Sequence, residues 1–115
     1  MTGTPAVPAV VPTDAAERVD GGAVLLDVRE PDEWTAGHAP SARWIPMGDL
    51  VARQAELPTD RDIVVVCRVG SRSARVAAAL RRAGYDAANL AGGMQAWAEA
   101  GLPVVTDSGD AGVVA

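Results

Sequence analysis

Short apolar runs alternate with amphipathic segments along this chain, and this alternation is its most informative pattern. The clearest runs cover residues 23–28, 63–66 and 87–90. The first two are apolar at nearly every position, which is typical of strands buried on both faces of a parallel sheet. Strands that alternate with short helices predict an α/β fold, in which helices flank both faces of a mostly parallel sheet.

Helical periodicity and capping residues predict five helices between these runs. Thr13 is placed to cap the first helix, and Pro31 lies near the start of the second. Gly37 and Gly84 are expected to end the second and fourth helices. The helices are expected over residues 14–19, from about 31 to 37, and over 49–55, 74–83 and 94–100, with further short strands near 9–11 and 43–45.

Size and composition fit one small domain. The chain has 115 residues, 49% of them hydrophobic, which is enough for one core. Residues 13–105 are expected to form the domain, after an N-terminal arm over residues 1–12. Residues 106–115 are small and polar and are expected to be a flexible C-terminal tail.

Charge and hydropathy exclude several kinds of partner. The net charge of -5 argues against a nucleic-acid partner, which would need a basic face. No apolar stretch approaches the ~20 residues of a membrane span, and the first twelve residues carry no basic residue of a secretory signal. We therefore expect a cytoplasmic protein in a reducing compartment, with neither nucleic acid nor membrane as a partner.

Cys67 is the only cysteine, and it follows the apolar run 63–66 directly. The next six residues lead into a helix, so the order is strand, thiol, short loop, helix. Ligands bind beyond the carboxyl ends of the strands in such sheets, which is where this thiol is expected to lie. A single cysteine excludes an intramolecular disulfide. One cysteine and one histidine are too few for a metal site, so no metal or organic cofactor is expected.

The residues after Cys67 suit the stabilisation of a thiolate. Lowering a cysteine pKa by two units requires about 2.7 kcal/mol, whereas a helix N-terminus contributes only ~0.3–1 kcal/mol, or ~2 in good geometry. Nearby guanidinium groups and direct N–H bonds must therefore provide the remainder. The residues expected to bind substrate in this way are Arg68, Val69, Gly70, Ser71, Arg72 and Ser73.

Other polar residues are expected to have lesser roles. Asp27 and Arg29 are predicted to support the loop from behind. His38, the only histidine, is interpreted as structural, and the tryptophans at positions 34, 44 and 97 are interpreted as bulk of the core.

A thiolate held by such donors needs no partner base if its substrate is a sulfur compound. It would attack a sulfane sulfur to leave a persulfide, from which a second nucleophile removes the sulfur.

Four blocks of the sequence resemble those of the rhodanese-like, single-domain sulfurtransferases. They cover residues 26–34, 37–46, 66–73 and 90–104, in family order and spacing. Ala39 and Ser41 depart from the usual aliphatic residue and glycine, which are small packing changes. The resemblance implies a five-stranded, mostly parallel sheet in a three-layer α/β/α fold, with a persulfide carried on Cys67. The family's loop arginine maps to Arg72, and Arg68 suits an anionic donor such as thiosulfate.

We therefore expect a sulfurtransferase that moves sulfane sulfur from thiosulfate or a persulfide to cyanide or a thiol. An alternative is a sulfur-carrier or regulatory module that serves a thiol-bearing partner protein and turns over poorly alone. A phosphatase or arsenate reductase is a third reading. Those enzymes place arginine six positions after the cysteine, where this chain has Ser73, so the loop is one residue short for a tetrahedral oxyanion.

Overall fold

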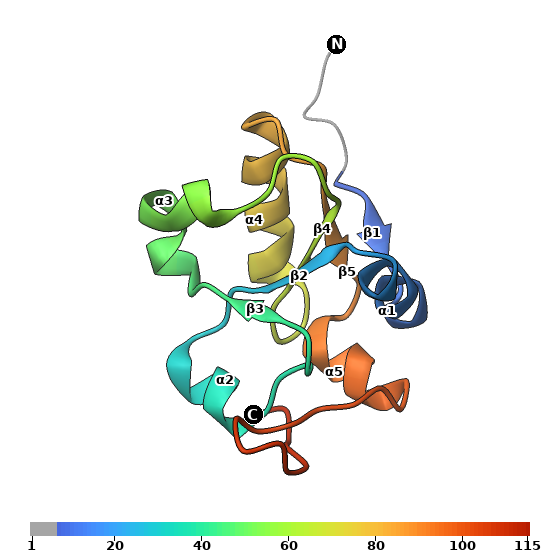
Figure 1. Ribbon diagram of the computed structural model, residues 1–115. Helices are drawn as coiled ribbons and strands as arrows, with labels where there is room; N and C mark the ends of the chain where they lie inside the picture. The colour runs from blue at the N-terminus through green and yellow to red at the C-terminus, as the bar shows by residue number, and fades with distance from the viewer. Residues whose placement is uncertain (1–6) are drawn as a thin grey trace.

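The computed structural model describes residues 7–115 and shows a five-stranded sheet between two layers of helices (Figure 1). The strand order is β1-β5-β4-β2-β3, and all four pairings are parallel. This arrangement confirms the α/β fold class and the five-stranded sheet. The strands are β1 (Ala9–Val10), β2 (Val24–Asp27), β3 (Arg43–Trp44), β4 (Ile63–Val66) and β5 (Ala87–Leu90).

Helices cover both faces of the sheet. α3 and α4 lie on one face and α1 and α5 on the other, while α2 lies beyond the carboxyl ends of the strands (Figure 1). Within residues 7–115, no helix combines the length and apolar character needed to cross a bilayer. The helices are α1 (Pro12–Asp20), α2 (Pro31–Ala36), α3 (Leu50–Arg53), α4 (Ser71–Arg82) and α5 (Gly93–Glu99), with 3₁₀ turns at Met47–Asp49 and Gln54–Glu56 beside α3.

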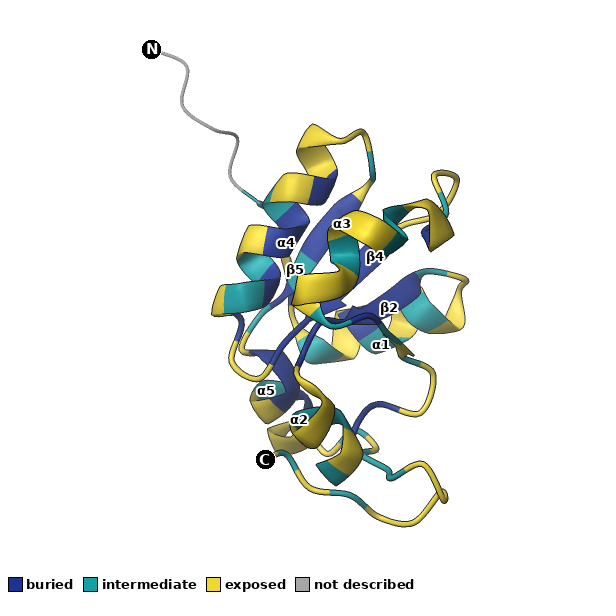
Figure 2. Cartoon of the chain, turned by 90° about the vertical axis from the view of Figure 1, so that its left-hand side faces the viewer, coloured by how far each residue is buried: buried dark blue, intermediate teal, exposed yellow. Residues whose placement is uncertain are grey.

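The central strands are buried on both faces, which explains their unbroken apolar runs. Figure 2 shows β2, β4 and β5 in the buried colour beneath helices whose outward sides are exposed. Successive side chains of β4 alternate between two apolar clusters. Ile63 and Val65 pack toward α4, whereas Val64 and Val66 pack toward α1 and α5. Cys67 continues the alternation on the α4 face.

Three helices begin earlier than the sequence predicted, α5 by one residue and α1 and α4 by more. α1 begins at Pro12, and its N-cap is Val11 without a side-chain hydrogen bond, so the prediction that Thr13 caps this helix is wrong. Proline suits the first helical position because its missing N–H would have no intrahelical partner there. α4 begins at Ser71, because Gly70 turns the chain into the helix with a left-handed φ of 112°.

The tryptophans do not share one role. Trp97 is buried and donates from Nε1 to the carbonyl of Pro103 at 2.8 Å, as a core residue. Trp34 and Trp44 are only partly buried and stack on each other with ring centroids 5.4 Å apart. The ring of His38 stacks on Trp34 at 3.6 Å. The interpretation of Trp34 and Trp44 as core bulk is therefore wrong, since their stack instead joins α2 to β3.

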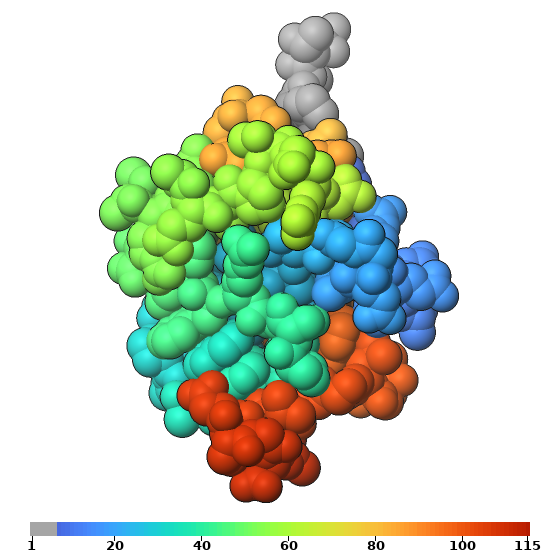
Figure 3. All heavy atoms as spheres, viewed as in Figure 1, coloured from blue at the N-terminus to red at the C-terminus, as the bar shows by residue number. Residues whose placement is uncertain are grey.

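The C-terminal segment, residues 106–115, folds back against α2 (Figures 1 and 3). The N–H of Val113 donates to the carbonyl of Ala36 at 3.0 Å, and that of Gly112 donates to the carbonyl of Val104 at 2.8 Å. The structure gives this segment a defined path, and its flexibility in solution stays a prediction. Of the expected N-terminal arm, residues 1–6 lie outside the described residues, and residues 9–10 form the edge strand β1.

Candidate active site at Cys67

Cys67 lies at the carboxyl edge of the sheet, where three strand ends meet. β2 and β4 pair in register with Asp27 opposite Val66, and β4 and β5 pair with Val65 opposite Asn89. Cys67 follows β4 directly, and its side chain is 0% exposed, at the edge of the apolar cluster under α4. The thiol is therefore placed where parallel sheets usually bind ligands, but it is closed off from solvent.

Backbone and hydroxyl groups of the loop surround the sulfur. The N–H of Gly70 donates to Sγ of Cys67 at 3.1 Å, and Oγ of Ser73 lies 3.2 Å from the same atom. A residue with a side chain would rarely adopt the left-handed φ of Gly70 that aims this N–H at the sulfur. The loop thus folds around Cys67 as a nest of donors.

The environment lowers the pKa of the Cys67 thiol. Burial is the largest single influence and raises this pKa, because it disfavours the charged form. The Ser73 hydroxyl, when it donates to the sulfur, and the backbone N–H groups of Ser73, Gly70 and Val69 lower it by more. Direct hydrogen bonds, rather than helix position alone, therefore favour the thiolate.

The start of α5 holds the other side of the loop. The N–H of Met94 donates to the carbonyl of Cys67 at 2.8 Å, and the N–H of Gln95 donates to that of Arg68 at 3.0 Å. A Cβ on Gly93 would lie 2.5 Å from backbone atoms of Cys67 and Arg68. The glycine is therefore required for this close approach, in which the carbonyls of Cys67 and Arg68 accept hydrogen bonds from the start of α5.

Arg72 is close enough to act on the thiol by charge but is bound to α2. Its two terminal nitrogens donate to the carboxylate of Glu33 at 2.7 and 2.8 Å. This hydrogen-bonded pair lowers the pKa of Glu33 to about 2 and raises that of Arg72, which the charge of Cys67 also raises. Sequence reasoning missed Glu33 as a site residue, although its position in the first turn of an acidic helix start was visible.

Arg68 and Ser71 do not contact the sulfur. Arg68 is exposed, and its Nε donates to the backbone oxygen of Ala115, the last residue of the C-terminal segment, at 2.8 Å. Ser71 is exposed at the start of α4. The structure therefore gathers Gly70 and Ser73 at the thiol, places Arg72 within electrostatic range, and leaves Arg68 at the surface.

Asp27 and Arg29 form a buried ion pair on the other side of the sheet. Arg29 donates from Nη2 to Asp27 at 2.8 Å and to the carbonyl of Gly37 at 2.8 Å, and both side chains are fully buried. The carbonyl of Arg29 accepts from Nε1 of Trp44 at 2.9 Å. The pair thus links β2 to the end of α2 and to β3 without contacting Cys67, an arrangement that suits the expected supporting role.

Asn89 of β5 is a site residue that sequence reasoning missed. Its Oδ1 lies 2.6 Å from Oγ of Ser73, and its Nδ2 donates to the carbonyl of Gly70 at 3.1 Å. It therefore contacts Gly70 and Ser73, which both hydrogen-bond to the sulfur. The visible sign was one amide side chain inside an otherwise apolar strand.

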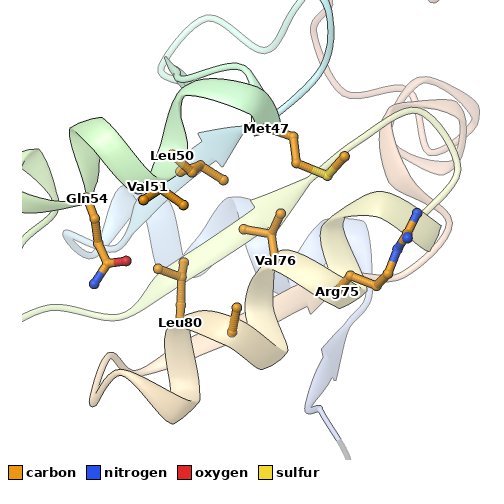
Figure 4. Close-up of a pocket in the computed structure, with 8 residues that line it drawn as sticks. Met47, Leu50, Val51, Gln54, Arg75, Val76 and Leu80 are labelled. Atoms are coloured by element: carbon orange, nitrogen blue, oxygen red, sulfur yellow. The ribbon is translucent and has the colours of Figure 1, made fainter.

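An apolar groove of about 260 Å³ lies between α3 and α4 (Figure 4). Val76 lines it and also belongs to the cluster that contains Cys67, but Cys67 itself does not line the groove. Arg75 is its one charged lining residue, so the groove holds no acid, base or nucleophile.

Residues 7–115 also contain no group of three or more His, Cys, Asp or Glu side chains that could hold a metal ion. The chemistry of this site rests on the Cys67 loop.

Comparison with known proteins finds a matching family and similar proteins for most of the chain. Residues 11–100 match the model of the rhodanese-like domain family. A "Sulfurtransferase" of Allochromatium vinosum is 44% identical over 87 residues, which cover 75% of this chain and 81% of that protein. The "Probable adenylyltransferase/sulfurtransferase MoeZ" of Mycobacterium tuberculosis is 39% identical over 95 residues, covering 78% of this chain but only 24% of that protein.

A solved structure of similar fold is the "Thiosulfate sulfurtransferase from Pseudomonas aeruginosa". It superposes with a TM-score of 0.79 at 28% sequence identity, over 95% of this chain and 22% of that one. This chain therefore corresponds to nearly the whole of one relative and to about a quarter of two others.

Proposed function

Because the chain belongs to the rhodanese-like family, we propose that it is a sulfurtransferase that carries sulfane sulfur as a persulfide on Cys67. Sulfurtransferase activity in general is supported by the family match over residues 11–100 and by the names of its relatives. The observation that carries the finer proposal is the donor nest at the sheet edge, in which the N–H of Gly70 meets Sγ of Cys67 at 3.1 Å.

The first step loads the sulfur. The Cys67 thiolate attacks the sulfane sulfur of thiosulfate or of a persulfide donor, and a new sulfur–sulfur bond forms as the donor's own sulfur–sulfur bond breaks. Sulfite, or the donor thiolate, leaves with the electron pair of that bond. The backbone N–H groups of residues 69–73 would stabilise the negative outer sulfur of the persulfide.

The second step unloads it. Cyanide or an acceptor thiolate attacks the outer sulfur, and thiocyanate or a new persulfide leaves while the Cys67 thiolate is restored. The two displacements balance without an oxidant, a reductant or a metal. Because Cys67 is 0% exposed, the groups that surround the sulfur would have to move aside before either reactant arrives.

The arginines would have different tasks. Arg72 is fixed on Glu33 and contributes a stationary positive charge close to the sulfur. Arg68 is at the surface and would turn from Ala115 to receive the anionic donor. Asp27 and Arg29 would keep the strand ends in place behind the loop.

Intact-mass measurement after incubation with thiosulfate tests the persulfide. The wild-type chain should gain the mass of one sulfur atom, cyanide should remove it, and Cys67→Ser should gain nothing. The same pair of proteins is then compared with persulfide donors and thiol acceptors. A wild-type chain that never gains sulfur from any donor would overturn the proposal.

A sulfur carrier acting with a partner protein is the second candidate. It is favoured by the coverage of the MoeZ relative, in which the similar region is only 24% of a longer protein whose name joins two activities. This candidate expects the persulfide to form, slow transfer to cyanide, and faster transfer to a protein thiol. The third hypothesis is a phosphatase or arsenate reductase. Hydrolysis of an aryl phosphate by the wild-type chain, but not by Cys67→Ser, would support it.

A further inference from the structure

The hydroxyl of Ser73 lies within reach of three acceptors but carries one proton. Its Oγ is 2.6 Å from Oδ1 of Asn89, 3.2 Å from Sγ of Cys67 and 3.3 Å from the carbonyl oxygen of Gly70. A hydroxyl donates one hydrogen bond and accepts others through its lone pairs. The three contacts therefore compete for a single proton, and the site must assign it to one of them.

The amide of Asn89 has only one consistent orientation. One of its polar atoms lies 3.1 Å from the carbonyl of Gly70, which can only accept, so that atom must be the NH₂ group. The other atom is then Oδ1, which carries no proton and faces Ser73. The 2.6 Å contact between Oδ1 and Oγ therefore requires the Ser73 proton.

This assignment leaves the sulfur facing lone pairs of Oγ. In the resting protein the thiol can donate to Oγ of Ser73, which in turn donates to Asn89. This arrangement of Ser73 and Asn89 favours the neutral thiol, whereas the backbone N–H groups of Ser73, Gly70 and Val69 favour the thiolate. A thiolate or a persulfide anion has no proton to donate and instead accepts hydrogen bonds. The Ser73 hydroxyl must then rotate away from Asn89 toward the sulfur.

We propose that Asn89 is a positioning residue that, through Ser73, holds a hydroxyl proton away from the resting Cys67 thiol and yields it when the sulfur becomes anionic. The inference rests on the proposed use of Cys67 as the sulfur carrier. Asn89 also donates to the carbonyl of Gly70, and the N–H of the same Gly70 donates to the sulfur. One amide thus braces two of the groups that hydrogen-bond to Cys67, the Ser73 hydroxyl and the Gly70 N–H.

Charged groups around the sulfur come from other elements and do not pass through Asn89. Arg72 of α4 acts on Cys67 by charge and is paired with Glu33 of α2. Asp27 and Arg29 of β2 pair with each other on the opposite side of the sheet. Asn89 is uncharged, so its replacement by an apolar residue should change the titration of the thiol through the two groups that it braces, the Ser73 hydroxyl and the Gly70 N–H, and not by charge.

The test is the pH dependence of Cys67 alkylation by iodoacetamide, which needs no sulfur donor. In Asn89→Leu the freed hydroxyl donates to the thiolate, and the midpoint should fall by about 0.5–1 pH unit, giving about three- to tenfold faster alkylation at pH values below the midpoint. Asn89→Asp keeps an acceptor on Ser73 and adds negative charge, so its midpoint should not fall. Asn89→Ala, which matches its alanine neighbours in β5, replaces the leucine variant if that protein does not fold.

The same substitution in a Ser73→Ala background distinguishes an effect through the Ser73 hydroxyl from a general loss of order in the loop. If Asn89 acts through Ser73, Asn89→Leu should lower the midpoint only when the hydroxyl is present. An equal shift in both backgrounds, or a midpoint that rises or stays unchanged in Asn89→Leu, would overturn the proposal. Failure of the persulfide mass test with a normal alkylation result would instead count against sulfur transfer alone.

Discussion

Arg72 and Glu33 face each other as a two-pronged ion pair, with nitrogen–oxygen distances of 2.7 and 2.8 Å. The pair joins the first turn of α4 to α2, 39 positions apart in the chain. Parallel hydrogen bonds of this kind fix the plane of the guanidinium as well as its position. Because Arg72 lies between Gly70 and Ser73, which both hydrogen-bond to Cys67, the carboxylate of Glu33 orients a cation of the site from another helix.

Glu33→Gln tests what this pair contributes to stability. The pKa of Glu33 is about 2 in the folded chain and 4.5 ordinarily, so the stabilisation is fully present above pH 4.5 and is lost as the pH falls toward 2. We expect the variant to lose about 1.5–3 kcal/mol at pH 7. In urea unfolding at a series of pH values, the difference from wild type should shrink between pH 4.5 and 2.

Glu56→Gln is the matched control, because Glu56 pairs with Arg53 at an exposed position. Its effect at pH 7 should be much smaller than that of Glu33→Gln, since exposed ion pairs contribute little. Equal losses of stability in the two variants, or a Glu33→Gln effect that does not depend on pH, would contradict the stabilising role of the Arg72–Glu33 pair.

Glycine substitutions should separate backbone strain from contact with the loop. Gly70 has a φ of 112° but room for a Cβ, with the nearest atom 3.6 Å away. Gly70→Ala should therefore cost about 1–2 kcal/mol and raise the pKa of the Cys67 thiol as its N–H shifts. Gly84→Ala, at φ 95° with nothing near, should carry a similar cost and leave the thiol unchanged.

Gly93→Ala should be more damaging than either. Its Cβ would meet backbone atoms of Cys67 and Arg68 at 2.5 Å, which a small side-chain movement cannot relieve. Urea unfolding gives the stability of each variant, and iodoacetamide alkylation gives the thiol pKa. A Gly93→Ala protein as stable as Gly84→Ala would show that α5 can separate from the loop without cost.

Asp27→Asn should destabilise the fold strongly. It leaves the buried charge of Arg29 without its counterion, while Nη1 of Arg29 already lacks a hydrogen-bond partner within residues 7–115. We expect a loss of about 3–5 kcal/mol in chemical denaturation. The double variant Asp27→Leu with Arg29→Met removes both charges and should lose less than Asp27→Asn alone. A larger loss in the double variant would instead assign the stabilisation to the bond from Arg29 to Gly37.

Gly112→Val should detach the C-terminal segment from α2. A Cβ at this position would lie 2.8 Å from Cα of Gly37 and 2.9 Å from the carbonyl of Ala36. Release of the segment frees Arg68 from Ala115. With thiosulfate as the proposed donor, its KM should then fall about two- to fivefold, which corresponds to the loss of one exposed hydrogen bond. In an Arg68→Ala background, Gly112→Val should not change the KM. An equal change in that background would show that the segment does not act through Arg68.

Local patterns predicted most of the elements correctly. The buried strands β2 and β4 were evident because a strand covered on both faces is apolar at nearly every position, and β5 was evident from a short apolar run interrupted only by Asn89. Gly37 and Gly84 marked helix ends, and Cys67 was placed at the carboxyl edge by its position after β4. The start of α4 was predicted three residues late, because the polar residues Ser71 to Ser73 read as loop although they form its first turn.

The sequence by itself determined the class of fold and the position of the thiol, since both follow from periodicity and from residues adjacent in the chain. Only the tertiary structure decided which side chains meet there. Arg72 meets Glu33 across 39 positions, Ser73 meets Asn89 across 16, and Arg68 meets Ala115 across 47. These contacts depend on strand order and on the path of the chain beyond the sheet, neither of which leaves a trace in local hydrophobic spacing.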